Sequence, residues 1–520
     1  MSDLDPIVVN ASRQPDGVAL VACGSRWTWR DLEVRVRDIA EELARAGVGR
    51  GTRVALLAGD GAQTVVAVHG VRRLGAILVP LNRRATASEI GQLLDDARPA
   101  VLLHDEDRAT AAEQAAAAAG TARGRRSGAS GIALRLLSLD ESPDGPPAAA
   151  GDDRLDPEAI ATICFTSGTT GRPKGAVLTV GNHLASAAAW AAVLRPRPTD
   201  RWLACLPFHH VAGLAMILRS SLWAVPLHLA GRFDPEAIWR AFDEDAISHC
   251  SIVGSTLARL VEARGGKPAP ATLRAVLVGA ERTPADAIAA ARRLGIPVMP
   301  TYGATETASG VTALEPAEAD EVPASAGRPL PGVELRVVAG EGADGRRVVS
   351  VDEIGEIEVR GRMVFAGYDG SPAETAAALA DGWFRTGDIG SLDTAGRLSV
   401  ADRRDDLIVS GGENVYPTEV EAVLRRHPAV ADAAVVGRSD ARWGKVPVAL
   451  VVISSSAGVA DGDLDAHCRA RLAGFKVPVA FVRVVSIPRT AGGKLLRGEA
   501  RTILEAASAD PGPSGTVGRR

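Results

Sequence analysis

The apolar positions in the first half of the chain follow two alternating patterns. Four of them recur at helical spacing after Thr28 and before Gly47, which predicts a helix capped by Thr28: Leu32, Val36, Ile39 and Leu43. Short continuous apolar runs at 54–58, 76–81 and 101–104 predict buried strands with helices between them. Strands that alternate with helices favour an α/β domain of largely parallel, helix-covered sheets.

The alternation is interrupted between residues 105 and 156. Residues 111–131 are rich in Ala, Gly, Ser and Arg, and residues 144–153 are rich in Pro, Ala, Gly and Asp. The first stretch could form a helix because alanine is a strong helix former, but 123–128 is typical of an exposed loop. We interpret 105–156 as a variable insertion of little functional content. The α/β pattern resumes at Ala159 and continues to about Val400.

After the charged cluster at 402–406 the pattern changes to mixed α+β. The predicted elements are helices at 417–426 and 464–472 and strands at 431–436, 446–453 and 480–485. We therefore predict a large α/β domain over 1–402, a hinge at 403–406, and a small α+β domain over 407–509. The tail at 510–520, rich in Gly, Pro and Ser, is expected to be disordered.

Composition and charge exclude several classes of protein. A chain of 520 residues that is 46% hydrophobic can bury sizeable cores, which excludes intrinsic disorder. The 59 Lys+Arg and 63 Asp+Glu give a net charge of −4, with no basic excess for nucleic acid. Apolar runs shorter than about 18 residues argue against a membrane span, and no signal peptide is expected at the start, so we expect a cytoplasmic protein. The five scattered cysteines predict neither disulfides nor a metal site.

The strongest chemical signal is a loop rich in glycine and hydroxyl groups. After the apolar run 159–165, the chain reads Thr-Ser-Gly-Thr-Thr-Gly-Arg-Pro-Lys-Gly over 166–175. Hydroxyls and flexible glycine amides can donate to phosphate oxygens, and the lysine adds positive charge. The loop lacks the Gly-Lys-Ser/Thr of a Walker A motif, so it predicts another kind of phosphate site. The residues predicted to bind phosphate are Thr166, Ser167, Gly168, Thr169, Thr170, Gly171 and Lys174.

Four further segments follow this loop in order. They read Tyr-Gly-Ala-Thr-Glu-Thr at 302–307, Arg-Thr-Gly-Asp at 385–388, Arg-Arg-Asp-Asp leading into Ser-Gly-Gly-Glu-Asn-Val-Tyr-Pro at 403–417, and Pro-Arg-Thr-Ala-Gly-Gly-Lys at 488–494. With these segments the chain resembles the adenylate-forming superfamily, which includes acyl- and aryl-CoA synthetases. The resemblance covers roughly residues 5–505. It implies that ATP converts a carboxylate into an acyl-AMP, which a thiol then attacks.

The resemblance also implies a nucleotide and metal site. Glu306 would bind Mg²⁺, which helps to neutralise the phosphates as an anionic acid attacks. Thr305 would bond the α-phosphate and is predicted to be catalytic, while Tyr302 would stack on adenine. The other predicted ATP-binding residues are Gly279, Ala280, Glu281 and Gly303, together with Asp388 and Arg403 on the ribose hydroxyls.

The small domain would contribute to both half-reactions. Lys494 resembles the lysine that contacts the reacting carboxylate and ATP during adenylation, so the resemblance implies that it is catalytic. Asp405 stands where the family has its hinge residue, although adjacent arginines and aspartates leave the register open by one residue. Rotation at this hinge would withdraw the lysine and bring Ser410, Gly411 and Gly412 to the pantetheine of coenzyme A.

Two residues, His210 and Arg219, are predicted to contact the acid, and His210 is also predicted to be catalytic. The segment Pro-Phe-His-His-Val-Ala-Gly at 207–213 resembles one in which a histidine lies near the acyl group, and alignment favours His210 over His209, although either could be structural. Arg219 lies in an apolar helical run and would need a partner if buried. That partner would be a second carboxylate on the substrate or a carboxylate of the protein. The absence of aspartate from 207–214 disfavours an amino acid as the substrate.

Within the superfamily, the chain is most similar to o-succinylbenzoate–CoA ligases, which share the arginine nine residues after the histidine. Gly254 departs from that pattern, where proline is usual. We expect an ATP- and Mg²⁺-dependent acid–CoA ligase for an aromatic or dicarboxylic acid such as o-succinylbenzoate. The alternatives are a general fatty or aryl acyl-CoA synthetase, an acyl-AMP ligase that loads an acyl carrier protein, and an inactive nucleotide-binding paralogue.

Overall fold

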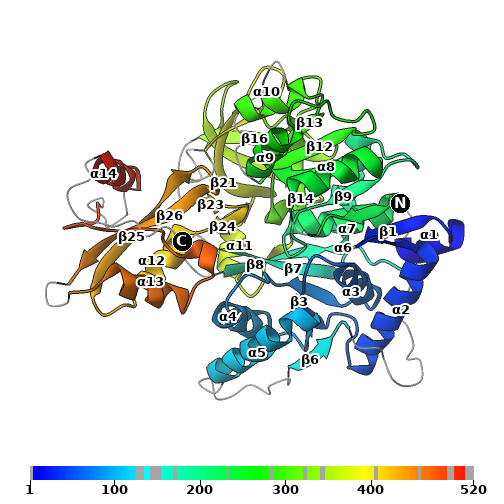
Figure 1. Cartoon of the computed structure of the whole chain (residues 1–520), viewed down its shortest axis with the longest axis horizontal. Helices are drawn as coiled ribbons and strands as arrows, with labels where there is room; N and C mark the ends of the chain where they lie inside the picture. Colours follow the sequence, from blue (N-terminus) through cyan, green and yellow to red (C-terminus); the bar gives the residue numbers. More distant parts are fainter. Residues whose placement is uncertain are drawn as a thin grey trace. The chain divides into compact units, whose positions relative to one another are not determined.

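The structure is a computed structural model (Figure 1). It describes residues 4–123, 134–140, 154–167, 173–231, 233–280, 283, 285–319, 322, 325–339, 346–402, 408–454, 458–488 and 497–509. The chain divides into two compact units, one of Met1–Thr166 and Lys174–Asp402, the other of Ser167–Pro173 and Arg403–Arg520. In the described part of the chain, no helix is long and apolar enough to cross a membrane. The predicted hinge and the predicted disordered tail lie outside the described residues.

One sheet of the first unit has seven strands in the order β19-β8-β7-β4-β3-β5-β6. The pairs β7–β4, β4–β3, β3–β5 and β5–β6 are parallel, while β19 pairs antiparallel with β8. The strands are β3 (Arg53–Leu57), β4 (Ile77–Pro80), β5 (Val101–His104), β6 (Arg135–Ser138), β7 (Ile160–Ser167), β8 (Pro173–Thr179) and β19 (Gly367–Tyr368). The helices that precede or join them are α1 (Pro6–Arg13), α2 (Trp29–Arg45), α3 (Ala62–Arg73), α4 (Ala87–Ala97), η1 (Glu106–Arg108) and α5 (Ala109–Arg123).

A second sheet has nine strands in the order β15-β14-β13-β12-β11-β9-β10-β1-β2. Its inner pairs are parallel, and β2, β14 and β15 add antiparallel strands at the edges. The strands are β1 (Val18–Ala22), β2 (Ser25–Thr28), β9 (Trp202–Ala204), β10 (Leu227–Leu229), β11 (His249–Val253), β12 (Ala275–Gly279), β13 (Val298–Ala304), β14 (Ser309–Ala313) and β15 (Arg328–Pro329). The helices among them are α6 (Val180–Leu194), α7 (Val211–Trp223), α8 (Pro235–Glu244), α9 (Gly254–Arg264), α10 (Ala285–Arg293) and η2 (Thr305–Thr307).

These two sheets form a layered core, with helices between the sheets and on their outer faces (Figure 1). The largest cluster joins Leu78 and Leu277, from the two inner faces, to Val36 of α2 and Leu214 of α7. A second cluster packs α4 and α5 on the outer face of the seven-stranded sheet, and a third packs α8, α9 and α10 on the other outer face. The predicted α/β class of largely parallel, helix-covered sheets is confirmed, as is the helix capped by Thr28.

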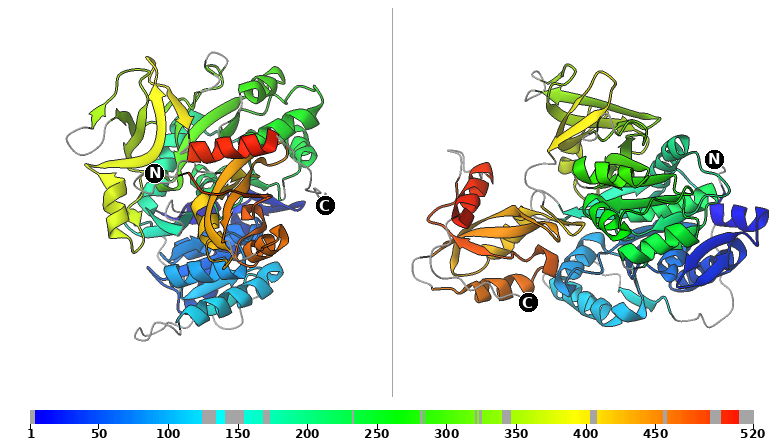
Figure 2. Two further views of the ribbon diagram at one scale, coloured as in Figure 1. Left: turned by 90° about the vertical axis from the view of Figure 1, so that its left-hand side faces the viewer. Right: turned by 45° about the horizontal axis from the view of Figure 1, so that its top comes forward.

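The segment 105–156, predicted to be a variable insertion in which a helix could form, contains helix α5, which packs against α4, and strand β6, which extends the parallel sheet beside β5. One sequence-based expectation for the first unit is wrong, because the α/β pattern ends well before Val400. The part near the end of the unit is an antiparallel sheet, drawn in yellow-green to yellow in Figure 2. Its elements are β16 (Val333–Ala339), β17 (Arg347–Val348), β18 (Gly355–Gly361), α11 (Pro372–Ala378), β20 (Leu379–Ala380), β21 (Trp383–Leu392) and β22 (Leu398–Asp402).

The second unit is a small α+β structure, as the sequence predicts. Its sheet has the order β24-β23-β26-β25, with β27 parallel to β26. Helices α12 and α13 pack on one face of this sheet and α14 packs on the other. The elements are β23 (Ile408–Ser410), β24 (Glu413–Val415), α12 (Pro417–Leu424), β25 (Val430–Asp440), β26 (Gly444–Ile453), α13 (Asp461–Arg469), η3 (Gly474–Lys476), β27 (Phe481–Arg483) and α14 (Arg497–Ala509).

A buried ion cluster fixes the start of the chain to the core. The carboxylate of Asp5 caps α1 through the Ile7 amide and accepts hydrogen bonds from Arg72 and Arg73 of α3 at 2.6 and 3.1 Å. Arg73 also makes a bidentate pair with Glu33 of α2. Burial alone would raise the pKa of Asp5, but the two arginines outweigh it and hold the pKa at about 2. The cluster therefore joins three helices, and Asp5 is ionised at neutral pH.

We expect Asp5→Asn to destabilise the protein by about 3 kcal/mol at neutral pH, because it leaves the buried Arg73 short of a counter-charge. Asp16→Asn is the matched control. Asp16 also pairs with an arginine, Arg30, but both side chains are largely exposed, so its loss should cost less than about 1 kcal/mol. Urea unfolding of both variants measures the difference. Equal, small effects would show that the Asp5 cluster does not stabilise the fold.

Candidate active site

The hairpin of β13, η2 and β14 carries four of the predicted nucleotide and metal residues: Tyr302, Gly303, Thr305 and Glu306. A side chain at Gly303 would place its Cβ 2.0 Å from the Ser309 carbonyl oxygen, so only glycine allows this close approach. Ala308 and Ser309 have φ angles of +51° and +101°, a strained backbone for residues with side chains. Such strain concentrates at functional sites, so this hairpin is a strong candidate for one.

Tyr302 and Asp388 are 86 positions apart in the chain but form a direct contact. The Tyr302 hydroxyl donates a 2.7 Å hydrogen bond to Asp388 Oδ2, and both residues are buried. Asp388 lies on β21 of the antiparallel sheet, where its amide donates to Thr386 Oγ1. The structure therefore brings the predicted adenine and ribose residues together from two different sheets.

The predicted metal and phosphate residues also converge, around a tyrosine that the sequence did not single out. Glu306 Oε1 accepts a 2.8 Å hydrogen bond from the Tyr368 hydroxyl. The Lys174 ammonium lies 5.3 Å from the centre of the Tyr368 ring and 2.9 Å from Glu374 of α11. The chain has only three tyrosines, so the scarcity of this residue type was the one available signal.

Other predicted nucleotide residues lie at the ends of strands in both sheets. Thr166, near the end of β7, donates to the Lys174 carbonyl at 3.4 Å. Gly279 ends β12 beside Thr301 of β13, and Ala280 follows with a φ angle of +66°. The backbone of Ser167 ends β7. Outside the described residues lie Gly168, Thr169, Thr170, Gly171, Glu281, Arg403, Asp405 and Lys494, so their roles remain predictions.

Arg219 lies on α7 with its guanidinium buried. Its Nη2 donates to Ser186 Oγ of α6 at 2.9 Å and to Ser309 Oγ of the strained hairpin at 2.6 Å, and the group lies 5.3 Å from the Trp190 ring centre. Among the residues that the structure describes, no carboxylate forms an ion pair with it. Burial lowers the pKa of Arg219 to about 9, so the group is charged at neutral pH. Ser186 and Ser309 were missed because nothing local in the sequence marks them.

The predicted acyl-site histidine, His210, is the N-cap residue of α7 and lies two and a half turns before Arg219. Its ring is stacked at a tilt on that of His209, with centres 4.2 Å apart. The segment is held by the Phe208 amide, which donates to Asp60 Oδ1 at 2.7 Å. Both histidines are half-buried, and their part in binding an acid stays a prediction.

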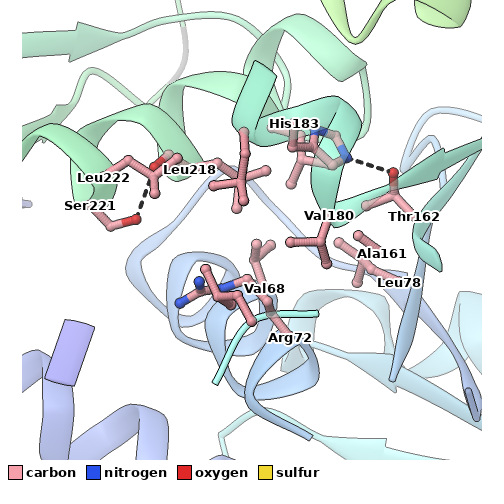
Figure 3. Close-up of a pocket in the computed structure, with 13 residues that line it drawn as sticks. Val68, Arg72, Leu78, Ala161, Thr162, Val180, His183, Leu218, Ser221 and Leu222 are labelled. Carbon is pink, nitrogen blue, oxygen red and sulfur yellow. Dashed lines mark hydrogen bonds between the residues drawn. The ribbon is translucent and has the colours of Figure 1, made fainter. Parts of the chain in front are cut away.

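A separate cavity of about 40 Å³ lies between α3, α6 and α7 (Figure 3). Leucine, valine and alanine dominate its lining, and none of the predicted site residues takes part. His183 Nε2 contacts Thr162 Oγ1 at 3.0 Å at its edge, and burial together with Arg219 lowers the pKa of His183 to about 4. The predicted acid-binding residues therefore do not line this mostly apolar space.

The predicted coenzyme A residues lie in the second unit. Ser410 ends β23, and Gly411 and Gly412 form the two-residue turn into β24, with φ angles of +58° and +82°. A hairpin turn with two positive φ angles favours glycine strongly. The turn geometry therefore accounts for the two glycines by itself, and contact with pantetheine remains a prediction.

Comparison with protein families places this geometry in a known context. A model of the AMP-binding enzyme family matches residues 8–369, and a model of the AMP-binding enzyme C-terminal domain matches residues 419–494.

Similar proteins cover almost the whole chain. Two relatives are 2-succinylbenzoate–CoA ligases: that of Geobacillus kaustophilus is 40% identical over 491 residues, and that of Bacillus cereus is 37% identical over 492 residues, in each case 94% of this chain and 96% of the relative. Among solved structures, an o-succinylbenzoate CoA synthetase variant from Bacillus subtilis, bound to a product analogue, has a TM-score of 0.88 and 34% identity. This match covers 96% of this chain and 98% of that one.

Tyr302→Phe removes the hydroxyl that bonds Asp388 and keeps the aromatic ring. If Asp388 binds ribose and Tyr302 stacks on adenine as predicted, we expect this variant to bind ATP less tightly. Loss of a hydrogen bond to a buried carboxylate should raise the KM for ATP about tenfold. For 3′-deoxy-ATP, the rise in KM should be much smaller. This nucleotide lacks the ribose 3′-hydroxyl, so Asp388 makes fewer hydrogen bonds to it in either enzyme. Steady-state kinetics with both nucleotides measure the two effects. An equal rise for both would mean that Tyr302 does not act through Asp388.

Proposed function

Because the chain belongs to the AMP-binding enzyme family, we propose that it is an ATP- and Mg²⁺-dependent acid–CoA ligase that activates 2-succinylbenzoate. In the first step, a carboxylate oxygen of the acid bonds to the α-phosphorus of ATP and pyrophosphate leaves. In the second, the coenzyme A sulfur bonds to the acyl carbon, AMP leaves and the thiol proton is released. The products are a thioester, AMP and pyrophosphate.

The names and ligands of similar proteins support this assignment. The curated relatives are named 2-succinylbenzoate–CoA ligase, and they match nearly the whole of this chain. The synthetase from Bacillus subtilis has been solved with ATP and magnesium, with the acyl-adenylate, and with a coenzyme A product analogue. These ligands represent successive stages of the proposed reaction, and they favour free coenzyme A over a carrier protein as the acceptor.

The observation that carries the choice of acid is the environment of Arg219. A guanidinium has five N–H donors, and its two bonds to Ser186 and Ser309 both come from Nη2. Burying a charge with only neutral partners is costly, unless a ligand supplies the opposite charge. Ser309 is four positions after Thr305, so the guanidinium lies beside the hairpin of the predicted metal ligand. A dicarboxylic acid could pair one carboxylate with the Arg219 guanidinium while its other carboxylate reacts beside the hairpin of the predicted metal ligand.

The residues around the hairpin fit magnesium. Glu306 offers hard carboxylate oxygens, which magnesium prefers together with phosphate oxygens and water. When bound, the ion would neutralise charge on the triphosphate. Lys174 would add positive charge, Asp388 would hold the ribose, and Arg219 would orient the acid, so that its reacting carboxylate meets the α-phosphorus. These roles make up our proposal for the site.

The test is thioester formation with 2-succinylbenzoate and two analogues that each keep one carboxylate, 2-butyrylbenzoate and 4-oxo-4-phenylbutanoate. With ATP, Mg²⁺ and coenzyme A, the wild type should give kcat/KM values about 100-fold higher for the diacid. Arg219→Gln should lose most of that preference for the diacid. Its kcat/KM for whichever monocarboxylate analogue the wild type activates should change little. Arg37→Gln, at an exposed arginine on α2, is the control.

Mass spectrometry of the thioesters, together with AMP, reads the outcome. If the wild type activates none of these acids, or transfers the acyl group only to a carrier protein, the proposed function is wrong. If Arg219→Gln lowers the rates of all three acids equally, the arginine has only a structural role.

We further propose that Lys494 serves only the adenylation step, as the resemblance implies. Lys494→Ala should lower acid-dependent pyrophosphate release at least about 100-fold while leaving thioester formation from supplied acyl-AMP within about threefold. Lys267→Ala, at an exposed lysine after α9, should affect neither step. Rapid-quench assays of the two half-reactions measure this. Equal losses in both steps would refute the separate role of the lysine.

A further inference from the structure

A short segment outside the predicted motifs contacts two charged groups of the candidate site. Residues 367–375, from β19 into the first turn of α11, carry Tyr368 and Glu374. Tyr368 contacts Glu306 through its hydroxyl and Lys174 through its ring, and Glu374 pairs with Lys174. The four side chains therefore form a continuous row from one carboxylate, through an ammonium and a phenol, to the other.

This segment is held rigidly. Tyr368 pairs with Ala176 in the antiparallel register of β19 and β8, two positions after Lys174. The Tyr368 amide donates to Thr375 Oγ1 at 2.8 Å, and Thr375 Oγ1 donates to the Ser371 carbonyl at 2.9 Å. The next residue, Asp369, makes a bidentate pair with Arg53 of β3 at 2.7 and 2.8 Å. A tyrosine fixed from its backbone in this way can orient the groups that it contacts.

The hydroxyl of Tyr368 acts on Glu306. A charge-assisted hydrogen bond of 2.8 Å restricts rotation of a carboxylate that would otherwise sample several rotamers. Metal binding depends on such fixed orientation, because outer groups that hydrogen-bond a ligand commonly change metal affinity by about 10- to 100-fold when removed. Tyr368 has the geometry of such an outer group.

Glu374 acts on Lys174. The Lys174 ammonium lies 2.9 Å from the Glu374 carboxylate. When a nucleotide is present, the ammonium can pair either with this carboxylate or with a phosphate. It also lies over the face of the Tyr368 ring, whose π electrons attract a cation. Since Lys174 is only partly exposed, the ion pair keeps the charge satisfied without a ligand, and a phosphate must compete with Glu374 for it.

We propose that Tyr368 is a positioning residue for the metal ligand Glu306, and that Glu374 is an internal counter-ion that holds Lys174 until a polyphosphate displaces it. Tyr368 separates the two functions, because its hydroxyl serves the metal side and its ring supports the ammonium. The two residues therefore have separate effects. The Tyr368 hydroxyl raises the affinity for the metal, and Glu374 lowers the affinity for pyrophosphate, which favours release of this product.

Tyr368→Phe tests the first half, since it keeps the ring and removes only the hydroxyl. In the presence of α,β-methylene-ATP, the Kd for Mn²⁺ should rise about tenfold, as measured by calorimetry or electron paramagnetic resonance. The Kd for pyrophosphate measured without metal should stay within about twofold of wild type, because Lys174 keeps its ring and its carboxylate partner. Unchanged Mn²⁺ affinity would overturn the positioning role.

Glu374→Gln tests the second half, because glutamine has nearly the same shape without the charge. The Kd for metal-free pyrophosphate should fall about fivefold, while Mn²⁺ affinity stays unchanged. Glu353→Gln, which removes a partly exposed carboxylate paired with Arg347 elsewhere in the unit, is the control and should change neither. Equal or weaker pyrophosphate binding by Glu374→Gln would overturn the counter-ion role. Glu374 is partly exposed, so this variant should fold even if Tyr368→Phe does not.

This inference rests on the proposed function only for the role of Glu306 as metal ligand and of Lys174 as phosphate ligand. Both binding measurements are made without any carboxylic acid. A failure of the acid panel would therefore leave these results interpretable, and normal activity on 2-succinylbenzoate with unaltered binding constants in both variants would refute this inference alone.

Discussion

The buried charge of Arg219 is the constraint on which the account of specificity depends. A guanidinium in the core, held by Ser186, Ser309 and the face of Trp190, carries a charge that these neutral groups only partly stabilise. Burial shifts its pKa downward but leaves it protonated at neutral pH. Removal of a counter-charge from such a group is costly, so a ligand that supplies one binds with a large advantage. A dicarboxylic acid meets this condition, and a simple fatty acid does not.

The hairpin of β13, η2 and β14 connects that charge to the residues predicted to bind ATP and magnesium. It carries Tyr302, Thr305 and Glu306 on the way out and Ser309 at the start of the return strand. Its tight approach at Gly303 and its positive φ angles at Ala308 and Ser309 are maintained by the surrounding sheets. Because residues predicted to bind the nucleotide share one rigid element with a serine that contacts Arg219, a bound acid and a bound nucleotide would have a fixed relative orientation in the proposed site.

Local patterns in the sequence predicted much of the fold. The helix after Thr28 and the strand at 101–104 are found as α2 and β5. The five elements predicted for the small domain are found in order as α12, β25, β26, α13 and β27, whereas β23, β24 and α14 were not predicted. What the sequence left open has physical causes. The alanine-rich stretch has a weak amphipathic pattern, so helix α5 was predicted only as a possibility within an insertion, and the short strand β6 was not predicted. Residues 333–402 pair antiparallel, and pairing partners far apart in the chain leave no periodic signal.

Motifs identified candidate site residues, but their partners came from the fold. The pairing of Tyr302 with Asp388 joins two sheets, and Tyr368, Glu374, Ser186 and Ser309 contribute single side chains without any motif. The cysteines show the same limit: Cys205 and Cys250 are 45 positions apart, yet neighbouring strands bring their sulfur atoms to 3.1 Å. Spacing along the chain identifies functional residues that lie close together in sequence, whereas contacts between distant elements can be identified only from the structure.

The most direct measurement of the central claim is a crystal structure of the protein with 2-succinylbenzoyl-adenylate bound. We predict that the carboxylate that is not joined to AMP lies within hydrogen-bonding reach of the Arg219 guanidinium, directly or through one water molecule. A structure in which that carboxylate binds elsewhere, while Arg219 keeps only its contacts with Ser186 and Ser309, would contradict the account.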